Sequence, residues 1–191
     1  SGDGRLTEVI AGHWRAPFQF DGGLTDTGIF FPFGQGLMYS DTLMAFGLLT
    51  IPSVGLGLNP SVAFQWSLII TSAIGYVSCL VLLRIGPRAP WPIAITASFI
   101  ATFSNGLVVA SNHPQLLALS LVPASALALL LALRASRLLS RVALGMCSGA
   151  IFGLTTYSTF AIAWFTTLGG LISLAFWALI ARSRFPVRRL I

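Results

Sequence analysis

The sequence predicts an all-α integral membrane protein, and three observations lead to this prediction. Hydrophobic residues make up 55% of the 191 residues, charged residues make up only 8%, and the mean hydropathy is +0.86. Soluble domains carry roughly 25% charged residues, so a soluble fold of this composition would expose a large apolar surface to water. Apolar runs near the length that a helix needs to cross a bilayer, about 20 residues, alternate with short polar segments.

Five apolar runs are predicted membrane spans, and together they make residues 61–191 a transmembrane bundle. The spans cover residues 61–83, 91–111, 116–133, 142–157 and 159–181. The last two come from Val142–Ala181, a stretch without a charged residue. As one helix it would measure about 60 Å, roughly twice the hydrocarbon thickness. The polar cluster Thr155–Thr159 is the expected hairpin between the two spans.

The charged residues are segregated along the chain, and this predicts which loops share a side of the membrane. All five acids lie in the first 41 residues, and there is no lysine. Arginine clusters follow the first, third and fifth spans, namely Arg84 and Arg88, Arg134 to Arg141, and Arg182 to Arg189. By the positive-inside rule these loops are cytoplasmic. Residues 1–60, 111–115 and 155–159 are then extracytoplasmic. The net charge of +6 is thus a topology signal, and we expect no nucleic-acid partner.

The N-terminal 60 residues are predicted to lie outside the bundle. Residues 1–41 form an extracytoplasmic loop that begins with an amphipathic surface helix, because Leu6, Val9, Ile10 and Trp14 recur at helical spacing. Residues 42–60 form an interfacial or re-entrant helix, since the apolar part, Thr42–Leu58, is short and interrupted by glycine and proline. The alternative is a full span here, which would move every later arginine loop to the other side.

Several short motifs occur in a fixed order along the chain. They are Gly2-Asp3, a helix with Trp14, Ile29-Phe30-Phe31-Pro32-Phe33-Gly34, Tyr39-Ser40-Asp41, Asn59-Pro60 and His113-Pro114-Gln115. This order resembles the first external loop and following spans of GT-C-type membrane glycosyltransferases and their bacterial relatives. The resemblance covers nearly the whole chain, but no span precedes Gly2 and the later spans are missing. We therefore expect the chain to be a fragment.

The resemblance implies a function and a set of site residues. It implies transfer of a sugar from a polyprenyl-phosphate-linked donor at the extracytoplasmic face of the bacterial plasma (inner) membrane, so the partners are the bilayer and this donor. Asp3 would act as the base and Asp41 as a second acid, with Arg5, His113, Gln115 and Tyr39 as substrate or phosphate contacts. It assigns no cofactor and leaves a divalent metal open, while the sequence has no His/Cys metal-ligand spacing.

Each candidate has a structural alternative. Asp3 is equally suited to the first turn of a helix, and Asp41, or Ser40 before it, to the N-cap of the next one. His113 is suited to packing at a helix start. The alternative function is a non-catalytic polytopic membrane protein, either a lipid handler or an assembly subunit. Ion-coupled transport is disfavoured, because no predicted span contains an acidic residue.

Overall fold

The computed structural model describes residues 2–15, 41–104, 114–159, 164–173 and 175–176. Within these ranges every regular element is a helix, which confirms the predicted all-α class. Among the described residues, three helical segments are long and apolar enough to cross a membrane, namely Pro60–Ile85, Leu116–Arg134 and Leu138–Ser158. The fold is therefore that of a helical membrane protein, whereas the five-span count and the sidedness stay predictions.

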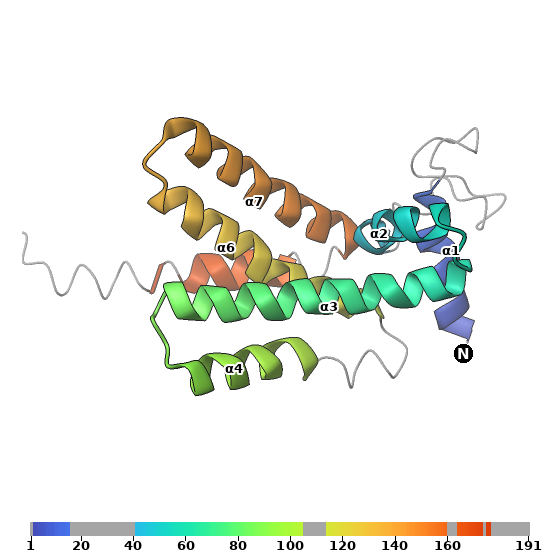
Figure 1. Ribbon diagram of the computed structural model, residues 1–191, viewed down its shortest axis with the longest axis horizontal. Coiled ribbons are helices and arrows are strands. Elements are labelled where there is room, and N and C mark those ends of the chain that lie inside the picture. The colour runs from blue at the N-terminus through green and yellow to red at the C-terminus, as the bar shows by residue number, and fades with distance from the viewer. Residues whose placement is uncertain (1, 16–40, 105–113, 160–163, 174, 177–191) are drawn as a thin grey trace, which may run out of the picture.

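The longest helix, α3 (Pro60–Ile85), is the centre of the arrangement. Asn59 caps its N-terminus, because the side-chain Oδ1 accepts a hydrogen bond from the Ser61 N–H at 2.9 Å, and Pro60 occupies the first helical position. Its 26 residues span about 39 Å, enough for the hydrocarbon core of a bilayer. α4 (Trp91–Phe103) turns back and packs beside α3 (Figure 1).

On its other side α3 contacts α6, and α6 packs against α7 (Figure 1). A short 3₁₀ helix, η3 (Pro114–Ser120), leads into α6 (Leu121–Arg134), and α7 (Leu138–Ser158) follows after a brief turn. Two buried serines join α6 to α7. The Ser125 hydroxyl donates to the Ser148 carbonyl at 3.0 Å, and the Ser148 hydroxyl donates to the Ser125 carbonyl at 2.9 Å. Small residues of this kind let helices approach closely inside a bilayer, where the hydrophobic effect does not drive helix association.

The polar cluster predicted as a hairpin is largely helical in the structure. α7 continues through Thr155 and Thr156 to Ser158, and only Thr159 has extended backbone. The hydroxyls of Thr155, Thr156 and Ser158 each donate to the carbonyl four residues earlier, at 2.9, 2.9 and 2.7 Å. These bonds satisfy the polar side chains inside a helix, so the cluster does not need to form a turn. α7 also begins at Leu138, four residues before the predicted span.

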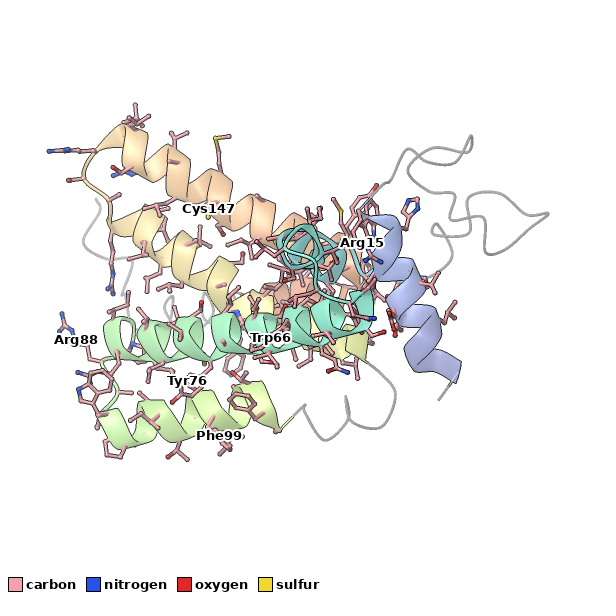
Figure 2. All side chains as sticks on the ribbon, turned by 45° about the vertical axis from the view of Figure 1, so that its right-hand side comes forward. Arg15, Trp66, Tyr76, Arg88, Phe99 and Cys147 are labelled. Carbon is pink, nitrogen blue, oxygen red and sulfur yellow. The ribbon has the colours of Figure 1, made fainter. Side chains whose placement is uncertain are left out.

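Two shorter helices, α1 (Gly2–His13) and α2 (Met44–Gly55), lie together at one end of the bundle (Figure 1). At 12 residues, α2 reaches about 18 Å, well short of the roughly 30 Å hydrocarbon core. The interfacial or re-entrant placement of this segment stays a prediction. The α3–α4 and α6–α7 turns, which carry arginines, lie at the opposite end, as the positions of Arg15 and Arg88 in Figure 2 illustrate.

Candidate functional site

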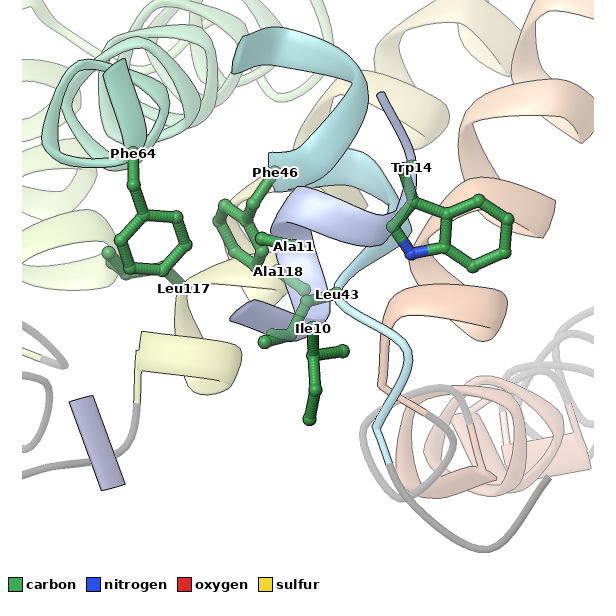
Figure 3. Close-up of a cluster of buried hydrophobic side chains, with 8 residues drawn as sticks. All are labelled: Ile10, Ala11, Trp14, Leu43, Phe46, Phe64, Leu117 and Ala118. Atoms are coloured by element: carbon green, nitrogen blue, oxygen red, sulfur yellow. The ribbon is translucent and has the colours of Figure 1, made fainter. Parts of the chain in front are cut away.

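The end of the bundle that carries α1 and α2 is organised around one buried apolar cluster. The cluster brings together four elements that are far apart in sequence, and its residues are Ile10, Ala11, Trp14, Leu43, Phe46, Phe64, Leu117 and Ala118 (Figure 3). Phe46 is completely buried. Its ring packs edge-on against that of Phe64, with 6.4 Å between the ring centroids. The cluster fixes α1, α2 and η3 on the N-terminal end of α3.

Trp14 attaches the end of α1 to the start of α2. Its indole Nε1–H donates to the Thr42 carbonyl at 2.6 Å, and the ring is only 5% exposed. The end of α1 can approach α2 closely because Gly47 of α2 lies against Trp14 and Ala11. A Cβ atom at Gly47 would lie 2.4 Å from the Ala11 carbonyl oxygen and 2.8 Å from the Trp14 side chain. The absence of a side chain at Gly47 is therefore what allows α1 and α2 to touch at this point.

The C-terminal end of α7 holds the residues before α2. The Leu43 N–H donates to the Ser158 carbonyl at 3.3 Å, and the Ala45 N–H donates to the Ser158 hydroxyl at 2.8 Å. The Thr42 hydroxyl donates to the Tyr157 carbonyl. Leu43 itself is buried and has left-handed backbone, with φ 53°. Such a conformation is unfavourable for leucine, and it persists here because the bonds to α7 and the apolar cluster fix both neighbours.

Asp41 stands directly before this fixed segment and is half-buried. The capping interpretation of Asp41 is wrong, and so is that of Ser40. The reason is that α2 begins at Met44 and its N-cap is Leu43, whose side chain makes no capping hydrogen bond. Helix capping therefore does not explain a carboxylate at this position. The backbone after Asp41 is held by α1 and α7, so the residue is attached to a well-packed part of the bundle.

Asp3 and Arg5 lie on the first turns of α1, as the first-turn interpretation of Asp3 expected. The last turn of α1 contacts α2, whereas its first turn lies on the side of α3 away from α2 (Figures 1 and 2). The structure thus anchors both predicted acids to the same end of the bundle but does not bring the Asp3 backbone to the start of α2. Farther along α1, the Glu8 carboxylate accepts a hydrogen bond from the Ser61 hydroxyl of α3 at 2.7 Å.

The remaining predicted site residues are only partly within reach of the structure. Tyr39 and His113 lie outside the described residues. Gln115 lies in η3, whose next residues join the apolar cluster with α1. Its backbone is therefore at the same end of the bundle as Asp41 and the N-terminus of α3. Among the described residues, no group of three or more His, Cys, Asp and Glu is arranged to hold a metal ion.

The sequence interpretation missed several residues that organise this end of the bundle. Ser158 and Tyr157 were assigned to a hairpin, although their carbonyls receive the hydrogen bonds that position residues 42 and 43. Leu43 was one apolar residue among many, and nothing in its neighbourhood signals a left-handed backbone. For Gly47 a signal existed, since an isolated glycine inside an apolar helix often marks a close backbone approach.

The fold and the site together define an all-helical membrane protein whose N-terminal segment packs over one end of the helices. No known protein family, curated protein or solved structure was found to match the chain.

Proposed function

We propose that the chain is part of a GT-C-like integral membrane glycosyltransferase, which transfers a sugar from a polyprenyl-phosphate-linked donor at the extracytoplasmic face of the membrane. One observation carries the proposal most directly. The described segments that bear the motifs of the resemblance, namely those with Asp3, Asp41, Asn59-Pro60 and Gln115, gather at one end of the bundle. That end presents carboxylates beside apolar helix surfaces, where a lipid-linked donor would be held at the membrane boundary.

The proposed chemistry follows from this placement. A carboxylate can accept the proton of an acceptor hydroxyl as the acceptor oxygen bonds to the sugar and the phosphate-linked carrier leaves. We assign this role to Asp3. Asp41 acts as a second acid at its own position, because the first turn of α1 lies away from the start of α2. Arg5, His113, Gln115 and Tyr39 are assigned to the phosphate and the sugar, since cationic and polar donors stabilise a phosphate leaving group.

The test uses the full-length protein in native membranes with a radiolabelled polyprenyl-phosphate-linked sugar. Asp3→Asn and Asp41→Asn should each lower transfer while expression and helical content stay unchanged. Loss of a general base costs about 10²- to 10⁴-fold in rate. Glu8→Gln is the matched control, because Glu8 is a carboxylate on the same helix as Asp3 whose contact is with Ser61.

Full transfer by both aspartate variants would refute the assignment of these residues. A different pair of results would favour the lipid-handling or assembly role. In that case the wild-type membranes transfer no sugar, while variants that disrupt the aromatic segment 29–34 abolish the cellular phenotype.

A further inference from the structure

The end of the bundle opposite α1 and α2 carries a concentration of positive charge. We call this the arginine rim, and it consists of Arg84, Arg88, Arg134, Arg137 and Arg141 at the α3–α4 and α6–α7 turns. Arg88 is labelled at this end in Figure 2. The sequence contains no aspartate or glutamate after Asp41, and the described acidic residues lie near the other end of α3, about 39 Å away. Charges so far apart do not compensate one another across a Debye length of about 8 Å.

Two of these arginines are fixed on one turn. The Arg84 guanidinium lies over the Trp91 ring at 4.4 Å, and its Nη1–H donates to the Ala89 carbonyl at 2.5 Å. Arg134 reaches across from α6, and its Nη1–H donates to the Ile85 carbonyl at 2.9 Å. Both cations are thus held against the residues that connect α3 to α4. A guanidinium has five N–H donors, so these carbonyl contacts leave most of each group able to bind an anion.

The surroundings of the turn indicate the kind of anion. Large apolar side chains beside these arginines are exposed, including Val81, Ile93 and Leu133. Trp91, which is 56% exposed, stands at the boundary between these apolar surfaces and the arginines, a position typical of tryptophan at the membrane–water interface. A ligand that fits this arrangement has a phosphate at the level of the guanidiniums and hydrocarbon chains along the helices.

We propose that the arginine rim binds the phosphate of an anionic phospholipid, with Arg84 and Arg134 as the principal contacts and the acyl chains covering the exposed faces of α3, α4 and α6. The proposal is independent of the glycosyltransferase function, because it concerns the opposite end of the bundle. It also goes beyond the topology rule, since that rule needs only the presence of arginines and not their fixation on one turn.

The test measures lipid binding to the 191-residue chain in detergent by native mass spectrometry. Phosphatidylglycerol and phosphatidylcholine with identical acyl chains are titrated in parallel. Each arginine near an anionic lipid surface contributes about fivefold in affinity. We therefore expect the wild type to prefer phosphatidylglycerol, and we expect R84Q/R134Q to bind it about twenty-five-fold more weakly. The affinity for phosphatidylcholine should change little.

Two variants separate a built site from net charge. R15Q removes one arginine at the other end of the bundle and should leave the preference unchanged. R84K/R134K keeps both charges but removes the planar guanidinium groups, which can bind a phosphate with two hydrogen bonds. Its preference for phosphatidylglycerol should therefore lie between those of the wild type and R84Q/R134Q. Circular dichroism checks that each variant is folded.

Equal affinity of the wild type for the two lipids would overturn the proposal without reference to any variant. It would also be overturned if R15Q lost as much affinity as R84Q/R134Q. Competition by glycerol phosphate at the same concentration as the lipid would show a free-phosphate site and would overturn the assignment to a phospholipid.

Discussion

Replacement of Trp14 by alanine should release α1 from the bundle. The side chain is 5% exposed, belongs to the cluster that joins α1 to α2, α3 and η3, and donates to the Thr42 carbonyl at 2.6 Å. Truncation of a buried tryptophan to alanine costs about 3–5 kcal/mol. The loss falls on one 12-residue helix, and a helix of this length is marginally stable by itself in water. We therefore expect local opening of α1 rather than global unfolding.

The magnitude can be measured by hydrogen exchange of the α1 amides in detergent. A loss of about 3–5 kcal/mol corresponds to an increase of roughly 10²- to 10⁴-fold in the opening equilibrium, while the amides of α3 should exchange at unchanged rates. Trp14→Phe keeps most of the apolar contact but removes the indole N–H. Its effect should be about 1–3 kcal/mol, because the Thr42 carbonyl loses its donor.

Val9→Ala is the control on the same helix, because Val9 is 54% exposed and its truncation should leave exchange in α1 nearly unchanged. The reasoning is refuted if Trp14→Ala leaves the α1 amides as protected as in the wild type. It is equally refuted if α3 and α1 become unprotected together, since this would mean that α1 does not open as a separate unit.

Two further predictions concern close contacts between helices. Gly47→Ala should accelerate exchange in α1, because a Cβ at Gly47 meets Trp14 and the Ala11 carbonyl oxygen within 2.8 Å; Gly149→Ala, which has nothing within 4 Å, should be neutral or stabilising by up to about 1 kcal/mol. Equal destabilisation by both glycine variants in the purified monomer would contradict this. Ser125→Ala and Ser148→Ala should couple in a double-mutant cycle of thermal stability by about 0.6–2 kcal/mol, because each hydroxyl bonds to the other residue's carbonyl; a coupling energy of zero would mean that these bonds do not hold α6 to α7.

Much of the fold could be read from the distribution of polar and apolar residues. The run that became α3 and the run from Leu116 are long, apolar and bounded by polar residues, so bilayer thickness alone indicates helices of this length. The start of α3 was predicted to within one residue, at residue 61 against Pro60 in the structure, but the capping role of Asn59 was not predicted. The same methods assigned residues 155–159 to a hairpin although α7 continues through Ser158. Threonine and serine are read as turn residues, but their hydroxyls can also bond within a helix.

The candidate site was less accessible to sequence reasoning. Motif order suggested that Asp3 and Asp41 belong together, but their mutual placement depends on how α1 crosses the end of α3. That path is decided by contacts such as Trp14 with Gly47 and Glu8 with Ser61. Such pairs join residues more than 30 positions apart, and composition or periodicity contains no information about them.

The sequence by itself thus determined that this is a membrane protein and that it is helical. It also determined the separation of the charges into an acidic N-terminal segment and later arginine clusters. These properties follow from local composition, because the cost of placing charge or unpaired backbone in a bilayer applies to every residue individually. Only the tertiary structure decided that α1, α2, α3 and η3 share one apolar cluster, that Asp41 is not a helix cap, and that Arg84 and Arg134 meet on one turn. These features depend on close packing between distant segments, where single hydrogen bonds and the absence of one Cβ select the arrangement.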